Sequence, residues 1–66
     1  MAKEKGNHPL FDWKDVQVGG VITLNLGANM EVVEIKGPFV TMRDEMGQHI
    51  AVAKNDKYFW NARYVG

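Results

Sequence analysis

The amino-acid sequence predicts an all-β domain of four to five short antiparallel strands with one short helical turn. Apolar residues alternate with polar residues in several short stretches, and glycine, asparagine or proline stands between one stretch and the next. Alternation places every second side chain on the same face of a sheet, so each stretch predicts a half-buried strand. With 66 residues the chain can build only one hydrophobic core, and we expect a single domain.

The domain is expected to begin near Leu10. Residues 1–9 are polar and include a glycine and a proline without any periodicity, which is typical of a flexible arm. From residue 10 the composition becomes apolar and aromatic, and Asp12 is placed to cap a short helical turn over residues 13–17. We therefore predict an arm over residues 1–9 and a β domain over residues 10–66.

Two strands are expected in the first half of the chain. In residues 18–26 apolar side chains fall at every second position. Residues 27–29 tolerate positive φ angles and predict a hairpin connection to a second strand over residues 30–36. The adjacent Val32 and Val33 interrupt the alternation of that second strand, which indicates a β-bulge.

A second hairpin is predicted over residues 39–53. A Gly-Pro pair breaks the preceding strand, because proline has no amide hydrogen to donate. Residues 39–43 then alternate again. A turn with Gly47, at a position that favours a left-handed conformation, connects them to a strand over residues 48–53.

The stretch over residues 54–66 carries four of the seven aromatic side chains. Its polar start predicts a single helical turn over residues 55–58, followed by a short strand that closes the end of a barrel. The alternation along the strands predicts the apolar core. Its members are Ile22, Leu24, Val33, Ile35, Val40, Met42, Ile50 and Val52.

This order of strands, turns and a late helical turn resembles that of SH3-like small β-barrels. Residues 18–24 and 30–35 resemble the opening hairpin of small uncharacterised bacterial SH3-like proteins and, more loosely, KOW and Tudor-type modules. Two positions depart from those patterns: Gly20 stands where the bacterial proteins usually have aspartate, and residues 27–29 lack the basic-glycine pattern of KOW modules. The resemblance implies a barrel that binds nucleic acid, a ribosomal or polymerase partner, or a modified side chain, and it transfers no functional residue.

The composition argues against several classes of function. Eight basic residues balance eight acidic ones, so the chain has no net positive charge. The long-range electrostatic attraction that draws a protein to nucleic acid or an anionic membrane is therefore missing. The chain has no cysteine and only two histidines, His8 and His49, so we expect no metal and no cofactor. No apolar run is long enough for a membrane span or a signal peptide, and we expect a cytoplasmic protein.

Catalysis is not expected either. The carboxylate pair of Asp12 and Asp15 lies at a helical start and the pair of Asp44 and Glu45 lies in a turn, where acidic residues commonly have structural roles. A glycine pair at positions 19–20 leads into a strand without a phosphate-binding motif, which favours a close approach between backbones. The sequence therefore predicts a non-enzymatic binding module with no catalytic residue.

The preferred binding surface lies on the outward side of the hairpin over residues 39–53. Phe39, Thr41, Arg43 and His49 are expected to lie side by side there, because residues that face one way on paired strands are neighbours. The mixture of an exposed ring and mildly basic groups is typical of a protein interface. The predicted partner is another protein, on which the chain acts as a small regulator or inhibitor.

The alternative binding surface is an aromatic and basic cluster near the C-terminus, which would stack single-stranded RNA or DNA and meet its phosphates. Its members are Lys54, Lys57, Tyr58, Trp60 and Arg63. A small barrel also needs large side chains in its interior, so at least two rings of this segment are expected to be buried. An open strand of the barrel is a further site for pairing, and a homodimer is one expected outcome.

Overall fold

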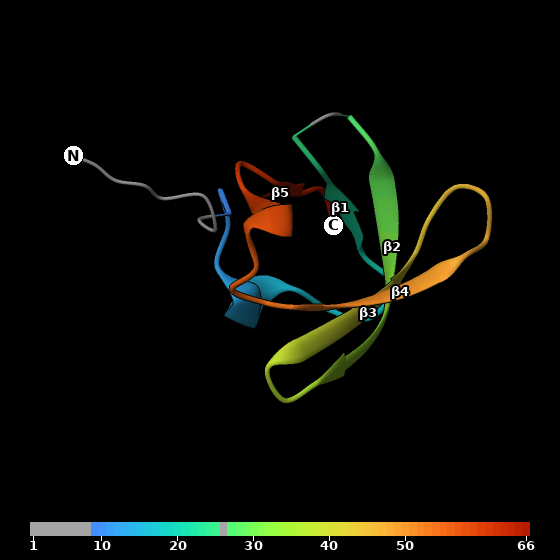
Figure 1. Cartoon of the computed structure of the whole chain (residues 1–66). Coiled ribbons are helices and arrows are strands. Elements are labelled where there is room, and N and C mark those ends of the chain that lie inside the picture. The colour runs from blue at the N-terminus through green and yellow to red at the C-terminus, as the bar shows by residue number, and fades with distance from the viewer. Residues whose placement is uncertain (1–8, 26) are drawn as a thin grey trace.

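In the computed structural model, which describes residues 9–25 and 27–66, five strands form one antiparallel sheet in the order β4-β3-β2-β1-β5 (Figure 1). The all-β class predicted from the sequence is confirmed. The arm predicted over residues 1–9 lies outside the described residues apart from Pro9. The strands are β1 (Val21–Thr23), β2 (Asn29–Lys36), β3 (Phe39–Arg43), β4 (His49–Ala53) and β5 (Arg63–Tyr64), and the 3-10 turns are η1 (Trp13–Asp15) and η2 (Lys57–Phe59).

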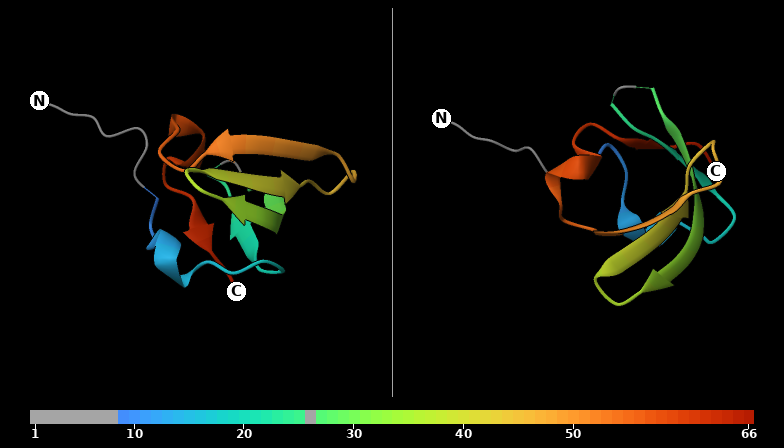
Figure 2. Two further views of the ribbon diagram at one scale, coloured as in Figure 1. Left: turned by 90° about the horizontal axis from the view of Figure 1, so that it is seen from below. Right: turned by 45° about the vertical axis from the view of Figure 1, so that its right-hand side comes forward.

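The sheet is strongly coiled, so that the β3–β4 hairpin lies across the first part of the sheet (Figure 1). Strand β2 joins the two halves, since its first residues pair with β1 and the remainder pairs with β3. Strands β4 and β5 form the two rims and do not pair with each other, so the sheet is open (Figure 2). No helix of the described residues is long and apolar enough to cross a membrane.

The β-bulge predicted in β2 is present. The register between β2 and β3 shifts between Val32 and Glu34, which leaves Val33 without a directly opposed partner. As a result Val32 is fully buried and Val33 is only half-buried. The prediction of Val33 as the core residue of this pair is therefore wrong, because the bulge keeps the side chain before it on the inner face.

Strand β1 is shorter than the predicted range of residues 18–26. The chain leaves the ladder at Leu24, whose N–H donates to the Ala28 carbonyl and whose carbonyl accepts from Gly27 in a tight turn. Before β1, the Gly20 carbonyl still accepts from the Val32 N–H, so this segment lies beside β2 without being part of the regular strand. The alternation predicted too long a strand, because the turns before and after β1 also contain apolar residues.

The hairpin of β3 and β4 follows the prediction closely. Residues 39–43 form β3, and β4 begins one residue later than predicted. The connecting turn has Gly47 at φ 88°, the left-handed conformation expected for it. The Asp44 carboxylate accepts hydrogen bonds from the N–H groups of Met46 and Gln48, so this acidic side chain stabilises the turn.

The core lies inside the coil of the sheet and is closed by residues from outside the strands. Ile22, Val40 and Met42 are fully buried as predicted, while Leu24, Ile35 and Val52 are partly buried against them. Ile50 was predicted as a core residue but remains 38% exposed, because it is the second residue of the edge strand β4, which has no neighbouring strand on one side among the described residues. The remaining buried apolar side chains are Val16, Met30, Val32, Phe59 and Ala62.

The C-terminal aromatic segment fills the open end of the coil. Turn η2 begins later than the predicted helical turn over residues 55–58, because the Asp56 carboxylate caps it by accepting from the Tyr58 N–H. The Phe59 ring is fully buried and packs edge-on against Trp13, with 4.9 Å between ring centroids. The predicted short last strand is present as β5 and pairs with β1, but it does not close the sheet, because it does not pair with β4.

Candidate functional site

Two adjoining hollows form a groove between the β1–β2 turn, the β3–β4 hairpin and η2. The first hollow has a volume of about 320 Å³ and the second about 350 Å³, and both are lined by Ala28 and Tyr58. The other residues of the first are Leu24, Asn25, Lys57 and Trp60. Those of the second are Met30, Asp44, Gln48, His49 and Ile50.

The aromatic wall of the groove is positioned by the packing of η2. Phe59 inserts into the core, and its ring holds Tyr58 edge-on at 5.4 Å between centroids. The Trp60 N–H donates to the Lys57 carbonyl, which ends the turn and leaves the Trp60 side chain 47% exposed. The buried Phe59 ring therefore anchors η2 and holds Tyr58, and Tyr58 and Trp60 lie beside the β1–β2 turn.

The opposite end of the groove opens into the inner face of the sheet. Met30 is buried, whereas Ile50 is exposed at the start of β4. Ile50 is opposite Met42 in the register and so points to the inner side, but no strand covers it beyond β4. An apolar side chain of a ligand would find apolar atoms here without displacing any part of the fold.

The groove carries few charges. Among the described residues that line it, Lys57 is the one lysine and Asp44 is the one carboxylate. Burial raises the pKa of the Tyr58 hydroxyl above its ordinary value of 10.0, and the negative charge of Asp44 raises it further. The hydroxyl therefore stays protonated near neutral pH and is both a donor and an acceptor for a ligand.

The preferred face predicted from the sequence does assemble on the outer side of β3 and β4. Arg43 is opposite His49 in the register, and Thr41 and Phe39 follow on the same side of β3. Phe39 is 53% exposed, as expected for an anchor, but Thr41 is half-buried. The Arg43 guanidinium is engaged in an ion pair with the Glu31 carboxylate of β2, which reduces its availability to a partner.

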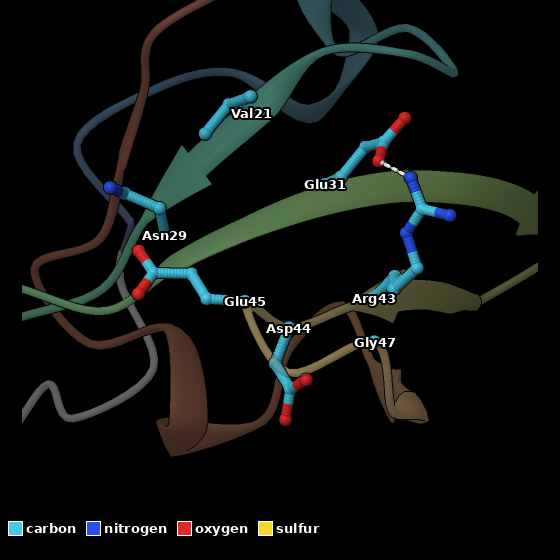
Figure 3. A pocket seen from close by; sticks show the side chains of 7 residues that line it. All are labelled: Val21, Asn29, Glu31, Arg43, Asp44, Glu45 and Gly47. Atoms are coloured by element: carbon cyan, nitrogen blue, oxygen red, sulfur yellow. Dashed lines mark hydrogen bonds and ion pairs between the residues drawn. The ribbon is translucent and has the colours of Figure 1, made fainter.

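A hollow of about 420 Å³ lies beside that ion pair on the outer side of the sheet (Figure 3). Its charged members are Arg43 and the three carboxylates of Glu31, Asp44 and Glu45. Figure 3 shows the Arg43 guanidinium directed at Glu31, while Glu45 extends toward Asn29 and Asp44 turns away. This surface has an excess of negative charge, which opposes binding of a phosphate backbone.

No known protein family, curated protein or solved structure matches the chain. The site is therefore interpreted from its own geometry. Within residues 9–25 and 27–66, no three histidine, aspartate or glutamate side chains converge to hold a metal ion. Asp12 and Asp44, which belong to the two carboxylate pairs considered above, accept backbone N–H groups at η1 and in the β3–β4 turn.

The alternative cluster predicted from the sequence is only partly assembled. Lys57, Tyr58 and Trp60 line the first hollow together. Lys54 instead lies over the Trp13 ring, with its Nζ 6.0 Å from the ring centroid. Arg63 lies on β5, where it is opposite Thr23 of β1. These two cations do not line the groove that the rings form.

Sequence reasoning missed the side of the groove contributed by the β1–β2 turn. Asn25 was interpreted only as an outward strand residue, Ala28 only as a linker residue and Leu24 only as a core residue. Their role depends on the approach of η2 to a turn that precedes it by about thirty positions in the sequence. The available signal was that only some of the C-terminal rings are needed to fill the core. A ring outside the core lies on the surface, where it is a candidate for binding.

Proposed function

We propose that the chain is a non-enzymatic module that binds an extended peptide segment of another protein in the groove. The observation that carries this proposal is the half-exposed Trp60 ring beside Tyr58, Leu24 and Ala28 in an apolar hollow of about 320 Å³. Exposed aromatic side chains in concave, weakly charged surroundings are typical anchors of protein interfaces. A small regulator or inhibitor of a cytoplasmic partner is the role that this binding serves.

The strand order supports an SH3-like barrel as the scaffold of this module. Five antiparallel strands in the order β4-β3-β2-β1-β5, with a 3-10 turn before the last strand, agree with the arrangement that the sequence resemblance implies. The groove lies between two turns and η2, all of which are connections between strands. Connections carry binding residues in many folds because the strands hold them in place.

A peptide fits the charge of the groove better than a nucleic acid does. The rings could stack bases, but Lys57 is the single lysine among the described residues that line their hollow, and Lys54 and Arg63 lie elsewhere. Asp44 lines the other hollow and would repel a phosphate. Lys57 at one end and Asp44 at the other instead favour a segment of mixed charge with an apolar side chain between.

The test is a selection of displayed random peptides on the immobilised protein, followed by anisotropy measurements on the enriched sequences. Wild-type protein is expected to enrich peptides with an aromatic or aliphatic anchor and to bind them with micromolar affinity. Trp60→Ala should weaken binding by about tenfold or more, since it removes the ring at the centre of the contact. Val65→Ala is the matched control, because Val65 is also an exposed apolar residue but lies outside the groove.

Two results would contradict the groove as the site. Loss of binding in Phe39→Ala with unchanged affinity in Trp60→Ala would place the peptide on the outer face of β3 and β4. Tight binding of single-stranded RNA or DNA that weakens steeply with salt would favour the nucleic-acid alternative. The oligonucleotides are titrated at low and moderate salt with the same two variants.

A further inference from the structure

Strand β4 is an edge strand without the features that usually protect such an edge. It has the sequence His-Ile-Ala-Val-Ala, with no proline, lysine or carboxylate. Edge strands of natural proteins commonly carry a charge, a proline or a bulge, because their unpaired backbone groups otherwise pair with another chain. In Figure 2 (left) β4 runs along the outer rim of the sheet with its far side uncovered by another strand.

The hydrogen bonds at the two ends of the hairpin determine which backbone groups of β4 are free. The Asp44 N–H donates to the Gln48 carbonyl and the Lys54 N–H donates to the Pro38 carbonyl. Bonded pairs alternate with non-bonded pairs along an antiparallel ladder, so Ile50 and Val52 direct their backbone groups toward β3. The N–H and carbonyl groups of His49 and Ala51, and the N–H of Ala53, therefore point to the open rim.

We propose that a second copy of this chain pairs with this rim, β4 against β4, antiparallel about a twofold axis at Ala51. In that register the Ala51 residues of the two copies form a hydrogen-bonded pair, and each His49 is opposite an Ala53. The Ala53 carbonyl already accepts from the Asp56 N–H, but the Ala53 N–H is free to donate to the partner's His49 carbonyl. The resulting sheet continues from one molecule into the other.

Both faces of this pair are self-complementary. On the inner face, Ile50 of each copy is opposite Val52 of the other, which covers the apolar side chain that the single chain leaves exposed. On the outer face the small Ala51 side chains meet at the axis, where two bulky or charged groups would collide. Pairing with an unrelated strand would not require β4 to match its own sequence in the antiparallel direction. Because β4 does match itself in this way, a second copy of the chain is the partner that its sequence fits best.

Charge at the ends of the strand supports the same register. Lys54, immediately after β4, comes opposite Gln48 of the other copy, next to the turn that contains Asp44 and Glu45. The twofold axis repeats this arrangement at the other end of the interface, so that neither end places two lysines or two carboxylates opposite each other. No like charges face each other within β4 itself, since the strand contains no lysine, arginine, aspartate or glutamate.

The dimer is measured by analytical ultracentrifugation of the full chain from about 1 μM to about 1 mM. The mass is expected to rise from the 7.5 kDa of one chain toward twice that value. Ala51→Lys, which places two lysines opposite each other at the axis, should raise the dissociation constant by at least tenfold. Val65→Lys is the control, because it adds the same charge at an exposed position that follows β5, the opposite rim of the sheet.

A second pair of variants tests the register directly. The chain contains no cysteine, so a single one can be introduced and cross-linked with a short bismaleimide. Ala51→Cys should give a covalent dimer, because the two Cα atoms of a hydrogen-bonded pair are about 5.5 Å apart. Val65→Cys, beyond the opposite rim, should give none above background.

Two outcomes would overturn the proposal. The first is a mass that stays at one chain across the whole concentration range. The second is a dimer whose affinity is the same in Ala51→Lys and whose Ala51→Cys form does not cross-link. Trp60 lies outside this interface, so Trp60→Ala should leave the dimer intact, and a failure of the dimer remains distinguishable from a failure of the peptide groove.

Discussion

At the β5 rim aromatic side chains cover a strand of two residues, whereas at the β4 rim a strand of five residues exposes its backbone and small side chains. The Tyr64 ring of β5 lies over Gly20, and its hydroxyl accepts from the Gln17 N–H at 3.2 Å. Phe11 packs against the same ring at 6.2 Å between centroids. The large rings therefore cover one rim of the sheet and leave the backbone of the other rim free to pair.

This division has a physical reason in the size of the chain. A domain of 66 residues buries only about 60% of the surface of its unfolded chain, so it has few large side chains to distribute. Phe59 packs edge-on against both Trp13 and Tyr58 at one end of the coil, so three of the large rings are concentrated there. The β4 half has Ile50, Ala51 and Val52 instead, and its inner face stays partly exposed.

Removal of the buried ring should have the largest effect on this division. Phe59→Ala is expected to lower the free energy of unfolding by about 3–5 kcal/mol, because it deletes a fully buried ring and leaves a cavity. A chain of this length has only about 3–10 kcal/mol in total, so the variant should lose most of its cooperative unfolding transition. Urea denaturation followed by circular dichroism measures the change.

Trp60→Ala is the matched control for that experiment. Trp60 directly follows Phe59, but its side chain is 47% exposed to solvent. Its truncation should therefore cost less than about 1 kcal/mol of stability. If both variants lose similar stability, the exposed wall of the groove contributes to the core, and the separation between stabilising and binding regions does not hold.

A smaller loss of stability is expected from a substitution at Gly20, where the Tyr64 ring of β5 lies over the segment before β1. A Cβ atom at Gly20 would lie 2.6 Å from two atoms of the Tyr64 ring, which is far inside van der Waals contact. Gly20→Ala should therefore cost about 1–3 kcal/mol through overpacking. The same substitution in a Tyr64→Ala background should cost at least about 0.5 kcal/mol less, because the two positions are in contact. Equal costs in both backgrounds would mean that the ring does not restrict Gly20.

The hairpin of β3 and β4 could be predicted from sequence because its determinants are local. Val40 and Met42 alternate with outward residues, and Gly47 supplies the left-handed turn conformation between the two strands. The bulge in β2 was also predictable, since two adjacent valines cannot both keep the alternation. The sequence did not predict which of the two valines is buried, because that depends on which side of the bulge keeps the register with β3.

The groove could be predicted only in part for a related reason. Within η2 and its flanks no period-2 rule applies, so the pattern did not distinguish the buried Phe59 from the exposed Trp60. The separation of Lys54 and Arg63 from the rings likewise depends on how the chain turns after β4. Gly20 is the opposite case, since its predicted close approach to a neighbouring strand agrees with the position of the Tyr64 ring above it.

The smallest predicted effect concerns Tyr58, which connects the core to the groove. Its pKa is raised above 10.0, first by burial and then by the charge of Asp44, so the unfolded chain loses this proton at a lower pH than the folded chain. The contribution to stability is thus fully present below the unfolded pKa and is lost as pH rises through the folded pKa. Urea unfolding of wild type and Tyr58→Phe should therefore show a steeper alkaline loss of stability in the wild type. The same slope in both proteins between about pH 9 and pH 11 would contradict the burial of the hydroxyl at the edge of the groove.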